Sequence, residues 1–380
     1  MEIYVVRAGD TLYGIAEKYA LDPAELARLN QLADPSRLPV GLALYIPGFD
    51  EGQRPGIEVN GYAYPNISAA VLNETLPYLT FFCPFSYSMT AEGALRPIDD
   101  RRLIFSAYAA SAAPLMTVTN LSESSGFSSD IAHAVFTDET VQNRVFDNIL
   151  STLREKKYYG INFNIEYVYP FDREGYNAFI RRAADVFHPL GYYLSTAIAP
   201  KESDAQGGLL YEAHDYAAHG RYMDRVVIMT YEWGYTYGAP QAVSPVDRMR
   251  SVLAYAVTKM PAGKILMGFS NYGYSWTLPY KKGTAARPLS LSEIPQTAYS
   301  QYADIRFDDT AQSPFFRYYD SAGTEHIAWF EDPRSIEAKL KLVSEYGLGG
   351  VSYWNINTLY RPNWAVLSGM YGIEKVFGQG

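Results

Sequence analysis

The sequence predicts an α/β protein, a closed barrel of eight parallel strands that are each followed by a helix, preceded by a small βααβ domain. After residue 56, eight short apolar runs alternate with longer helical patterns, which is typical of a parallel sheet covered by helices. Eight such units close into a (β/α)8 or TIM barrel. At roughly 150 residues per domain, the 380 residues suffice for both parts. The expected divisions are residues 1–48, a linker at 49–56 and the barrel at 57–380.

The composition excludes several classes of protein. Hydrophobic residues make up 48% of the chain and charged residues 19%, as in a globular protein. The 41 acidic residues outnumber the 32 basic residues, and the resulting negative charge opposes binding to nucleic acid or to an anionic membrane surface. Cys83 is the single cysteine, so an internal disulfide and a cysteine-based zinc site are excluded. We expect no metal, no cofactor, no nucleic acid partner and no membrane partner.

The sequence contains no evident targeting segment. The first residues, Met1–Val6, lack the basic start and the apolar run of an export signal, and no window reaches the roughly 18 apolar residues of a membrane helix. We therefore expect a protein that is made in the cytoplasm, and we expect it to be a monomer. The 34 tyrosines and five tryptophans are typical either of core packing or of a groove for sugars, nucleobases or peptides.

The N-terminal domain is expected to have the order strand, helix, helix, strand. Ile3–Val6 alternates like a strand, and Gly9-Asp10-Thr11 then precedes apolar residues at helical spacing, with its Asp or Thr as the expected N-cap. A second helix is expected to begin at Asp22-Pro23 and to end at Asn30. The alternation over Leu42–Ile46 predicts the closing strand.

These residues also give the N-terminal domain a family resemblance. It resembles a LysM module, a small fold whose members bind glycans that contain N-acetylglucosamine. The resemblance implies that the sugar lies between the Gly-Asp-Thr-Leu loop and the loop of residues 31–37. The matching residues are Tyr4, Val6, Gly9-Asp10-Thr11-Leu12, Ile15-Ala16, Leu29-Asn30, Gly41 and Ile46-Pro47. The candidate glycan-binding residues are Gly9, Asp10, Thr11, Leu12 and Asn30, of which Asp10 and Thr11 are also expected to cap a helix.

Eight apolar runs after the linker are the expected barrel strands. The clearest helix between them spans Thr137–Lys157, where apolar residues repeat at every fourth position behind a Thr cap. The long irregular segment at about 278–331 is expected to be an α+β insertion between strands seven and eight, because barrels accept insertions in the loops after their strands. The expected strands are Ile57–Tyr62, Tyr78–Cys83, Pro114–Val118, Gly160–Glu166, Tyr192–Ala197, Arg225–Tyr231, Lys264–Phe269 and Gly350–Trp354.

The fourth predicted strand carries polar residues on the face that points into the barrel. Its residues alternate, so the apolar side chains share one face and Asn162, Asn164 and Glu166 share the other. Burying two amides and a carboxyl group costs free energy unless they are hydrogen-bonded, as they would be in a purely structural polar cluster. Glu166 stands at the C-terminal end of the strand, where barrel enzymes hold their reacting groups. This position favours an active site.

The strand-four run resembles the signature of family 18 glycoside hydrolases, Asp-Gly-x-Asp-x-Asp-x-Glu. The resemblance places Glu166 on the proton donor of the family, Tyr231 on the residue that binds the acetamido carbonyl of the sugar, and Trp354 on the aromatic floor. Supporting segments are Asn60-Gly61-Tyr62 and Met229-Thr230-Tyr231-Glu232. The candidate catalytic residues are Glu166, Asn164 and Tyr231, and the candidate substrate-binding residues are Tyr62, Asn162, Glu232, Trp233 and Trp354.

Within that family, the chain resembles the LysM-bearing N-acetylglucosaminidases of endospore-forming bacteria, which act on cortex fragments during spore germination. This resemblance implies that the substrate is spore peptidoglycan or another glycan with N-acetylglucosamine, and that the protein is deposited on the spore coat or cortex. The segments that carry it are Pro84-Phe85-Ser86-Tyr87, Thr230–Tyr235, Tyr272–Trp276 and Trp329–Ser335.

The family resemblance implies retaining hydrolysis of a β-1,4 bond after N-acetylglucosamine, assisted by the substrate itself. Glu166 protonates the bridging oxygen while the carbonyl oxygen of the 2-acetamido group attacks the anomeric carbon, and Glu166 then acts as the base for water. To donate a proton near neutral pH, Glu166 needs a raised pKa. An apolar barrel mouth with aromatic walls would supply the desolvation that raises it.

The chain departs from the family signature at Asn164, where the family has Asp. An amide oxygen still accepts a hydrogen bond from the acetamido N–H but carries no charge, and removing one electrostatic partner typically costs about 10²–10³ in rate. We therefore expect slow hydrolysis unless Glu232 substitutes for the missing carboxylate. The alternative is a glycan-binding spore coat protein that kept the groove and lost turnover. An ordinary chitinase fits less well, because such an enzyme would be exported.

Other motifs support different functions only weakly. Gly268–Tyr272 nearly matches the nucleophile elbow of a serine hydrolase, but the closing glycine comes one residue late. His214 and His219 are five residues apart and have no third ligand nearby, which argues against a metal site. Any tryptophan could belong to the core. Trp233 and Trp354 are expected in the sugar groove because both stand at or just beyond strand ends.

Overall fold

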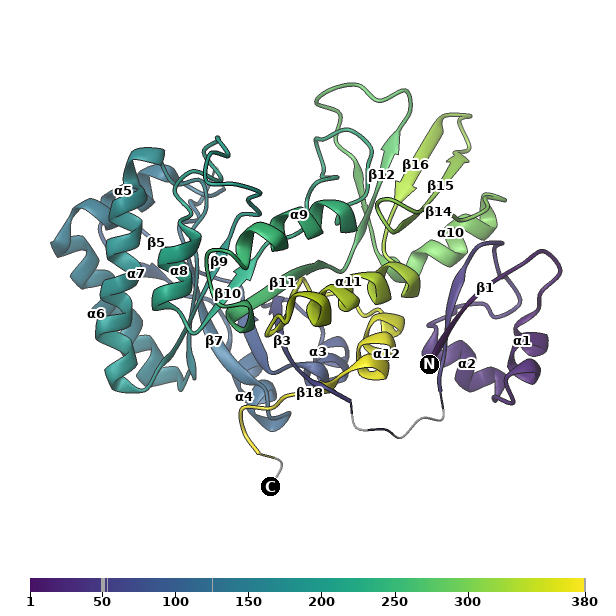
Figure 1. Cartoon of the computed structure of the whole chain (residues 1–380), viewed down its shortest axis with the longest axis horizontal. Helices are drawn as coiled ribbons and strands as arrows, with labels where there is room; N and C mark the ends of the chain where they lie inside the picture. Colours follow the sequence, from purple (N-terminus) through teal and green to yellow (C-terminus); the bar gives the residue numbers. More distant parts are fainter. Residues whose placement is uncertain (49–51, 53, 125, 379–380) are drawn as a thin grey trace.

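The computed structural model describes residues 1–48, 52, 54–124 and 126–378. Part of the predicted linker, residues 49–51 and 53, lies outside the described residues. Figure 1 shows the small N-terminal domain beside a larger body in which helices surround a sheet.

Eight parallel strands close into a barrel, which confirms the predicted fold. Each strand pairs with the next one around the barrel, and the last pairs with the first. Each of the eight predicted runs contains one of these strands or most of it. They are β3 (Gly56–Ala63), β4 (Phe81–Pro84), β7 (Ala113–Thr119), β8 (Gly160–Asn164), β9 (Tyr193–Ile198), β10 (Arg225–Ile228), β11 (Ile265–Ser270) and β17 (Gly350–Trp354).

Two strands end earlier than the sequence predicts. β8 ends at Asn164 instead of Glu166, and β10 ends at Ile228 instead of Tyr231. In both places the backbone soon turns through a left-handed conformation, with φ of 54° at Tyr167 and 66° at Glu232. A residue with positive φ interrupts a strand, so Glu166 and Tyr231 stand on the rim loops instead of within the sheet.

Helices cover the outside of the barrel (Figure 1). The predicted helix at 137–157 is α6, whose N-cap is Asp138 and not the expected Thr137, because the Asp138 carboxylate accepts the N–H groups of Thr140 and Val141 at 2.8 and 3.2 Å. The helices are α3 (Ala69–Thr75), α4 (Arg101–Ala109), α5 (Ser129–Thr137), α6 (Glu139–Lys156), α7 (Arg173–Phe187), α8 (Tyr216–Tyr222), α9 (Val246–Ala256), α11 (Pro333–Tyr346) and α12 (Arg361–Met370).

Several short elements complete the barrel domain. Single 3-10 turns connect some of the longer elements, and three short strands extend the barrel sheet. The 3-10 turns are Leu76–Tyr78, Pro170–Asp172, His188–Leu190, Ala262–Lys264 and Leu291–Glu293, and the strands are β5 (Tyr87–Met89), β6 (Leu95–Arg96) and β18 (Gly372–Ile373).

The predicted insertion between strands seven and eight is present as an antiparallel sheet with one helix. The sheet begins at Gly273 and not near residue 278, because β12 follows β11 after two residues and pairs with β13 and β16. Figure 1 shows this sheet standing above the barrel. Its elements are β12 (Gly273–Thr277), β13 (Arg287–Leu289), α10 (Ile294–Ser300), β14 (Arg306–Asp308), β15 (Ser313–Tyr319) and β16 (Glu325–Trp329).

The N-terminal domain has the predicted order of elements. β1 (Glu2–Val5) pairs antiparallel with β2 (Ala43–Ile46), and α1 (Leu12–Lys18) and α2 (Pro23–Leu29) lie between them in the chain. Thr11, one of the two expected N-caps, caps α1 by accepting the N–H of Gly14 at 3.1 Å.

The N-terminal domain is docked on the barrel domain. The Gln31 side chain accepts the N–H of Arg361 at 2.8 Å and donates to the carbonyl of Leu359 at 3.0 Å, at the start of α12. The N–H of Ile305 donates to the carbonyl of Val40 at 2.9 Å. These hydrogen bonds join the two domains in this structure.

Within the part of the chain that the structure describes, none of the helices combines the length and apolar character needed to cross a bilayer.

Candidate active site

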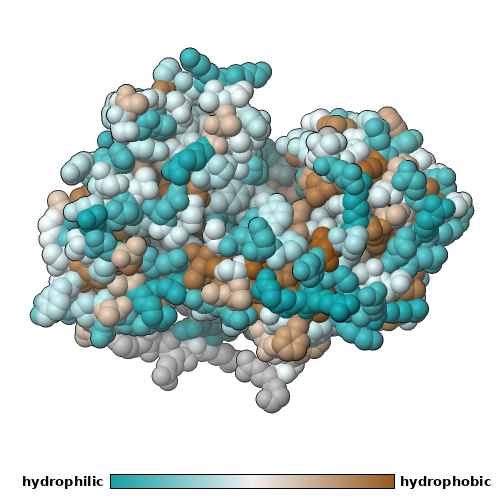
Figure 2. All heavy atoms as spheres, turned by 180° about the vertical axis from the view of Figure 1, so that it is seen from behind, coloured by the Kyte–Doolittle hydropathy of each residue, from teal (hydrophilic) through white to brown (hydrophobic). Residues whose placement is uncertain are grey.

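A cleft of about 850 Å³ opens at the C-terminal ends of the barrel strands. Figure 2 shows the surface hollowed between the insertion and the opposite rim of the barrel. The loops after β8, β9 and β10 and the end of β17 all contribute to its walls, as expected where the carboxyl ends of parallel strands meet. The residues that line it include Asn164, Glu166, Pro200, Met229, Tyr231, Glu232 and Trp354.

Of the residues described, Glu166 is one of two carboxyl groups, with Glu232, that line this cleft. Its side chain is partly buried in the cleft wall, and burial raises the pKa of Glu166 to about 7. The side-chain amide of Asn164 lowers that pKa, and the negative charge of Glu232 raises it. A carboxyl group with a pKa near 7 is protonated in a large fraction of molecules at neutral pH, so it can act as a general acid.

Asn164 presents an unpaired acceptor to the cleft. The residue is 4% exposed and lines the cleft, and its Oδ1 atom has no hydrogen-bond partner. A buried polar atom without a partner costs free energy. A ligand N–H that reached this oxygen would remove that cost.

Tyr231 and Glu232 follow β10 and also line the cleft. Gly268 in β11 leaves room for the Tyr231 ring, because a Cβ there would lie 2.8 Å from Tyr231 Cε1. Burial raises the pKa of the Tyr231 hydroxyl well above its usual value, so the hydroxyl remains a hydrogen-bond donor. The Glu232 carboxylate accepts hydrogen bonds from the hydroxyls of Tyr272 and of Tyr274, the latter at 3.1 Å.

Trp354 forms an aromatic surface at the end of β17. Its ring lies 4.7 Å from that of Phe85 and 5.7 Å from that of Tyr64, measured between centroids, and both pairs meet edge to face. Phe85 and Tyr64 also line the cleft. Such contacts fix the indole plane, and a flat apolar surface of this kind suits the face of a pyranose ring.

Three of the predicted substrate-binding residues are not among those that line the cleft. Tyr62 and Asn162 lie beneath it, 1% and 0% exposed, and the Tyr62 hydroxyl donates to Asn162 Oδ1 at 2.9 Å. Asn162 in turn donates to Ser195 Oγ at 2.9 Å. These two residues therefore form a hydrogen-bonded pair inside the barrel. Trp233 packs against the main hydrophobic core instead of facing the cleft.

Sequence reasoning missed most of the aromatic walls. They come from loops that follow the strands, and no periodic pattern marks a loop residue. A search for aromatic residues within a few positions of each predicted strand end would have found most of them. They are Tyr64, Phe85, Phe127, Tyr167, Tyr211 and Tyr235.

A second groove, of about 440 Å³, lies in the N-terminal domain and includes three of its five candidate residues. Asp10 is held there by hydrogen bonds from the Arg7 N–H at 2.7 Å and from the Tyr4 hydroxyl at 2.8 Å. Gly9 adopts φ of 88° in the preceding turn. The groove is lined by Asp10, Thr11, Leu12, Tyr13, Pro23, Ala24, Ala27, Pro35 and Ser36.

Asn30, a predicted glycan-binding residue, does not line this groove. It is 4% exposed, and its side chain accepts the Tyr45 N–H at 2.7 Å and donates to the Tyr45 and Leu26 carbonyls at 2.9 and 3.0 Å. Asn30 therefore ties α2 to β2. Its role in this structure is to hold the domain together.

Among the described residues, no three His, Cys, Asp or Glu side chains gather as metal ligands. His214 and His219, weighed above as ligands, are both buried, and burial lowers the pKa of His214 to about 4 and that of His219 to about 3. Both are therefore neutral near pH 7.

The chain belongs to glycoside hydrolase family 18 and carries a LysM domain. Residues 116–358 match the family described as Glycosyl hydrolases family 18, and residues 4–47 match the LysM domain. The barrel, its rim cleft and the strand-four acid agree with this class of glycosidase.

Two of the similar proteins match this chain over nearly its whole length. The chain is 43% identical to the cortical fragment-lytic enzyme of Bacillus subtilis (strain 168), with 99% of each sequence covered. It matches the crystal structure of the Bacillus megaterium QM B1551 spore cortex-lytic enzyme SleL with a TM-score of 0.93 and 32% identity, covering 99% of both chains. It also matches the crystal structure of a chitinase from Chromobacterium violaceum with a TM-score of 0.77 and 27% identity, covering 83% of this chain and 98% of the chitinase.

Proposed function

We propose that this chain hydrolyses β-1,4 bonds after N-acetylglucosamine in the peptidoglycan of the spore cortex. The observation that carries the proposal is Glu166, a carboxyl group with a pKa of about 7 in a cleft that is also lined by Asn164, with its unpaired amide oxygen, and by Tyr231. The names of the relatives from Bacillus, which refer to cortical fragments and spore cortex, support this choice of glycan.

In the proposed reaction, the substrate provides the nucleophile. Glu166 protonates the bridging oxygen, which leaves as a hydroxyl group of the departing sugar. As its bond to the anomeric carbon breaks, the carbonyl oxygen of the 2-acetamido group attacks that carbon and forms an oxazolinium ion. The Tyr231 hydroxyl donates a hydrogen bond to that carbonyl and holds it in place. Glu166, now ionised, removes a proton from the incoming water, so the β configuration is retained.

Asn164 binds the acetamido group without adding charge. Its free Oδ1 accepts the acetamido N–H, which would otherwise be desolvated in the cleft. The positive charge that develops on the sugar is offset instead by Glu232, whose carboxylate is fixed by two tyrosine hydroxyls. Because Asn164 itself brings no charge to this position, we expect catalysis to be slower than with Asp at position 164.

The LysM groove provides a second glycan site on the same molecule. A glycan strand held there raises the concentration of cleavable bonds near the cleft. We propose accordingly that the protein is located on the spore cortex or coat and acts as a monomer.

The test is to incubate the protein with spore cortex fragments and with chito-oligosaccharides and to measure new reducing ends. We expect hydrolysis that the Glu166→Gln variant lacks. If the wild-type protein and Glu166→Gln release equal amounts, while both still bind the glycan, the protein is a glycan-binding protein that lacks turnover. This second function is supported by Asn164, which stands where the family has the charged residue Asp.

A further inference from the structure

The backbone of Glu166 is held by side chains after the strand that carries it has ended. The last paired residue of β8 is Asn164, which lies opposite Thr119 of β7 and Ala197 of β9. Glu166 lies two residues beyond this point, and the next residue, Tyr167, has φ of 54°. A tyrosine in the left-handed region is strained, so the turn needs support from its surroundings.

Asn120 supports Glu166 from the β7 side. It directly follows β7 and is fully buried. Its Oδ1 accepts the N–H of Glu166 at 3.0 Å, and its Nδ2 donates to the carbonyl of Glu166 at 2.8 Å. Nδ2 also donates to the carbonyl of Ser128 at 2.9 Å, next to α5. The Asn120 amide thus makes the backbone hydrogen bonds that a neighbouring strand would otherwise make to Glu166.

His214 supports the preceding residue from the β9 side. Its Nδ1 accepts the N–H of Ala199 at 2.9 Å, and its Nε2 donates to the carbonyl of Ile165 at 3.0 Å. His214 is 1% exposed. A carbonyl only accepts and an N–H only donates, so both contacts require a neutral ring with its proton on Nε2.

We propose that Asn120 and His214 are positioning residues that clamp the backbone of Ile165 and Glu166 from both sides and so aim the Glu166 carboxyl group at the bridging oxygen. This inference rests on the proposed function of Glu166. The two clamps act on the backbone, so the carboxyl group remains free to reach the substrate. Small misplacements of a catalytic group cost large factors in rate. The turn itself is also held by Ser129, whose hydroxyl donates to the carbonyl of Tyr167.

The test compares substrates that differ in their need for an acid. A sugar leaving group must be protonated, whereas 4-nitrophenolate leaves without much help. We therefore measure kcat and KM of Asn120→Asp on chito-oligosaccharides and on 4-nitrophenyl glycosides of N-acetylglucosamine. Ionised Asp has nearly the shape of Asn but cannot donate to the Glu166 carbonyl. We expect kcat to fall about tenfold more on the sugar leaving group than on 4-nitrophenolate, with KM little changed.

His214 is tested with a pair of variants. Gln retains one donor and one acceptor, whereas Phe fills the space without either. We expect His214→Phe to show the same selective loss as Asn120→Asp, and His214→Gln to recover part of it. The matched control is Asn148→Asp, far from the cleft, where Asn148 donates to the carbonyl of Gly93 at 2.9 Å. It should leave the ratio of the two rates unchanged.

A second measurement does not depend on activity. The Glu166 N–H is hydrogen-bonded to Asn120, so its exchange with deuterium should be slow in the wild type and faster in Asn120→Ala. Equal losses on both substrates, together with unchanged exchange at Glu166, would overturn the clamp while leaving the proposed function intact. If Glu166→Gln is as active as the wild type, the proposed function fails. The clamp is then judged by exchange alone, and unchanged exchange overturns it.

Discussion

The proton on Glu166 determines how the proposed activity depends on pH. Burial raises its pKa to about 7, so the protonated fraction is high below this pH and falls as the pH rises through it. Since only the protonated acid can donate to the bridging oxygen, kcat/KM should fall about tenfold per pH unit above about pH 7. A pH–rate profile on chito-oligosaccharides measures this. A rate that stays constant across the neutral range and beyond would contradict it.

A second residue-scale prediction concerns Asn164→Asp. The new carboxylate would offset the positive charge that develops on the sugar, so turnover should rise by about 10²-fold. It would also disfavour ionisation of Glu166, so the fall in rate at high pH should move to higher pH. Both effects are read from one set of pH–rate profiles, with Asn148→Asp as the control for an Asn-to-Asp change elsewhere. Unchanged turnover would mean that the charge at position 164 does not limit the reaction.

Single residues differ in how far the sequence predicts their role. The position of Glu166 on the rim was predictable because alternation and its place at a strand end both indicate the rim, whereas its role stays a prediction. Tyr62 and Asn162 obey the same alternation but point into the barrel below the cleft, and the depth of a residue along the barrel axis has no local signal. Asn30 matched a family pattern, yet its side-chain amide is hydrogen-bonded to the backbone of Tyr45. A motif therefore indicates which residue type stands at a position, but it does not indicate which atoms that residue contacts.

At the scale of elements, the barrel strands were predictable because each is a short apolar run between turn signals. Their ends were not, since a strand ends where its neighbours stop pairing. β12 was missed as part of the insertion for a related reason. It follows β11 after two residues, and its partners β13 and β16 lie 10 or more residues further along the chain.

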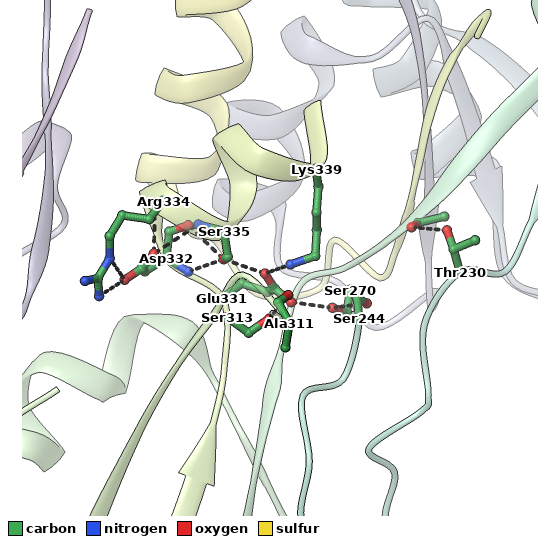
Figure 3. A network of polar contacts seen from close by, with 11 residues as sticks. Thr230, Ser244, Ser270, Ala311, Ser313, Glu331, Asp332, Arg334, Ser335 and Lys339 are labelled. Carbon is green, nitrogen blue, oxygen red and sulfur yellow. Dashed lines mark hydrogen bonds and ion pairs between the residues drawn. The ribbon is translucent and has the colours of Figure 1, made fainter. Parts of the chain in front are cut away.

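The junction between the insertion and α11 contains a buried ion pair that supports an element-scale prediction. Figure 3 shows Lys339 of α11 pointing at Glu331, which Ser335 and Ser270 also contact. The Lys339 Nζ atom lies 2.5 Å from Glu331 Oε2, and both side chains are almost fully buried. Replacing Lys339 with Met leaves the buried Glu331 carboxylate with its serine hydrogen bonds but without a counter-charge. We expect the free energy of unfolding to fall by about 3–5 kcal/mol at neutral pH, measured by urea titration.

The pH dependence of that loss has a definite sign. Burial already raises the pKa of Glu331, and Lys339 opposes the increase. Without Lys339 the folded-state pKa would rise further above the unfolded value, so Lys339→Met should regain stability as the pH falls. The double variant Glu331→Gln/Lys339→Met, which removes both charges, should lose less than the single variant at neutral pH. A single-variant loss that does not change with pH would show that the missing charge is not its cause.

At the scale of the whole molecule, the contact between the two domains determines how the LysM groove is used. Arg334, which is paired with Asp332 at the start of α11, donates to the carbonyl of Gly41 at 3.1 Å. Gly41 has φ of 84°, and a Cβ there would lie 1.9 Å from the carbonyl oxygen of Ile305. The two domains therefore fit only while residue 41 is a glycine. Under the proposed function, a docked LysM groove would offer a glycan strand to the cleft in one direction, whereas a tethered one would only keep the strand nearby.

Gly41→Val tests this difference. The side chain would collide with Ile305 and would require an unfavourable φ, so the domains should separate while each keeps its own core. We expect a larger radius of gyration by small-angle X-ray scattering and faster proteolysis in the segment between the domains. Activity on long cortex strands should fall several-fold, since the LysM groove no longer directs the strand into the cleft. Activity on short chito-oligosaccharides should not change.

Gly323→Val controls for the backbone strain alone. Gly323 lies in an exposed turn of the insertion with a similarly positive φ of 77°, and a Cβ there would meet no atom within 4 Å. If separated domains degraded long strands as fast as docked ones, the LysM domain would act as a tether.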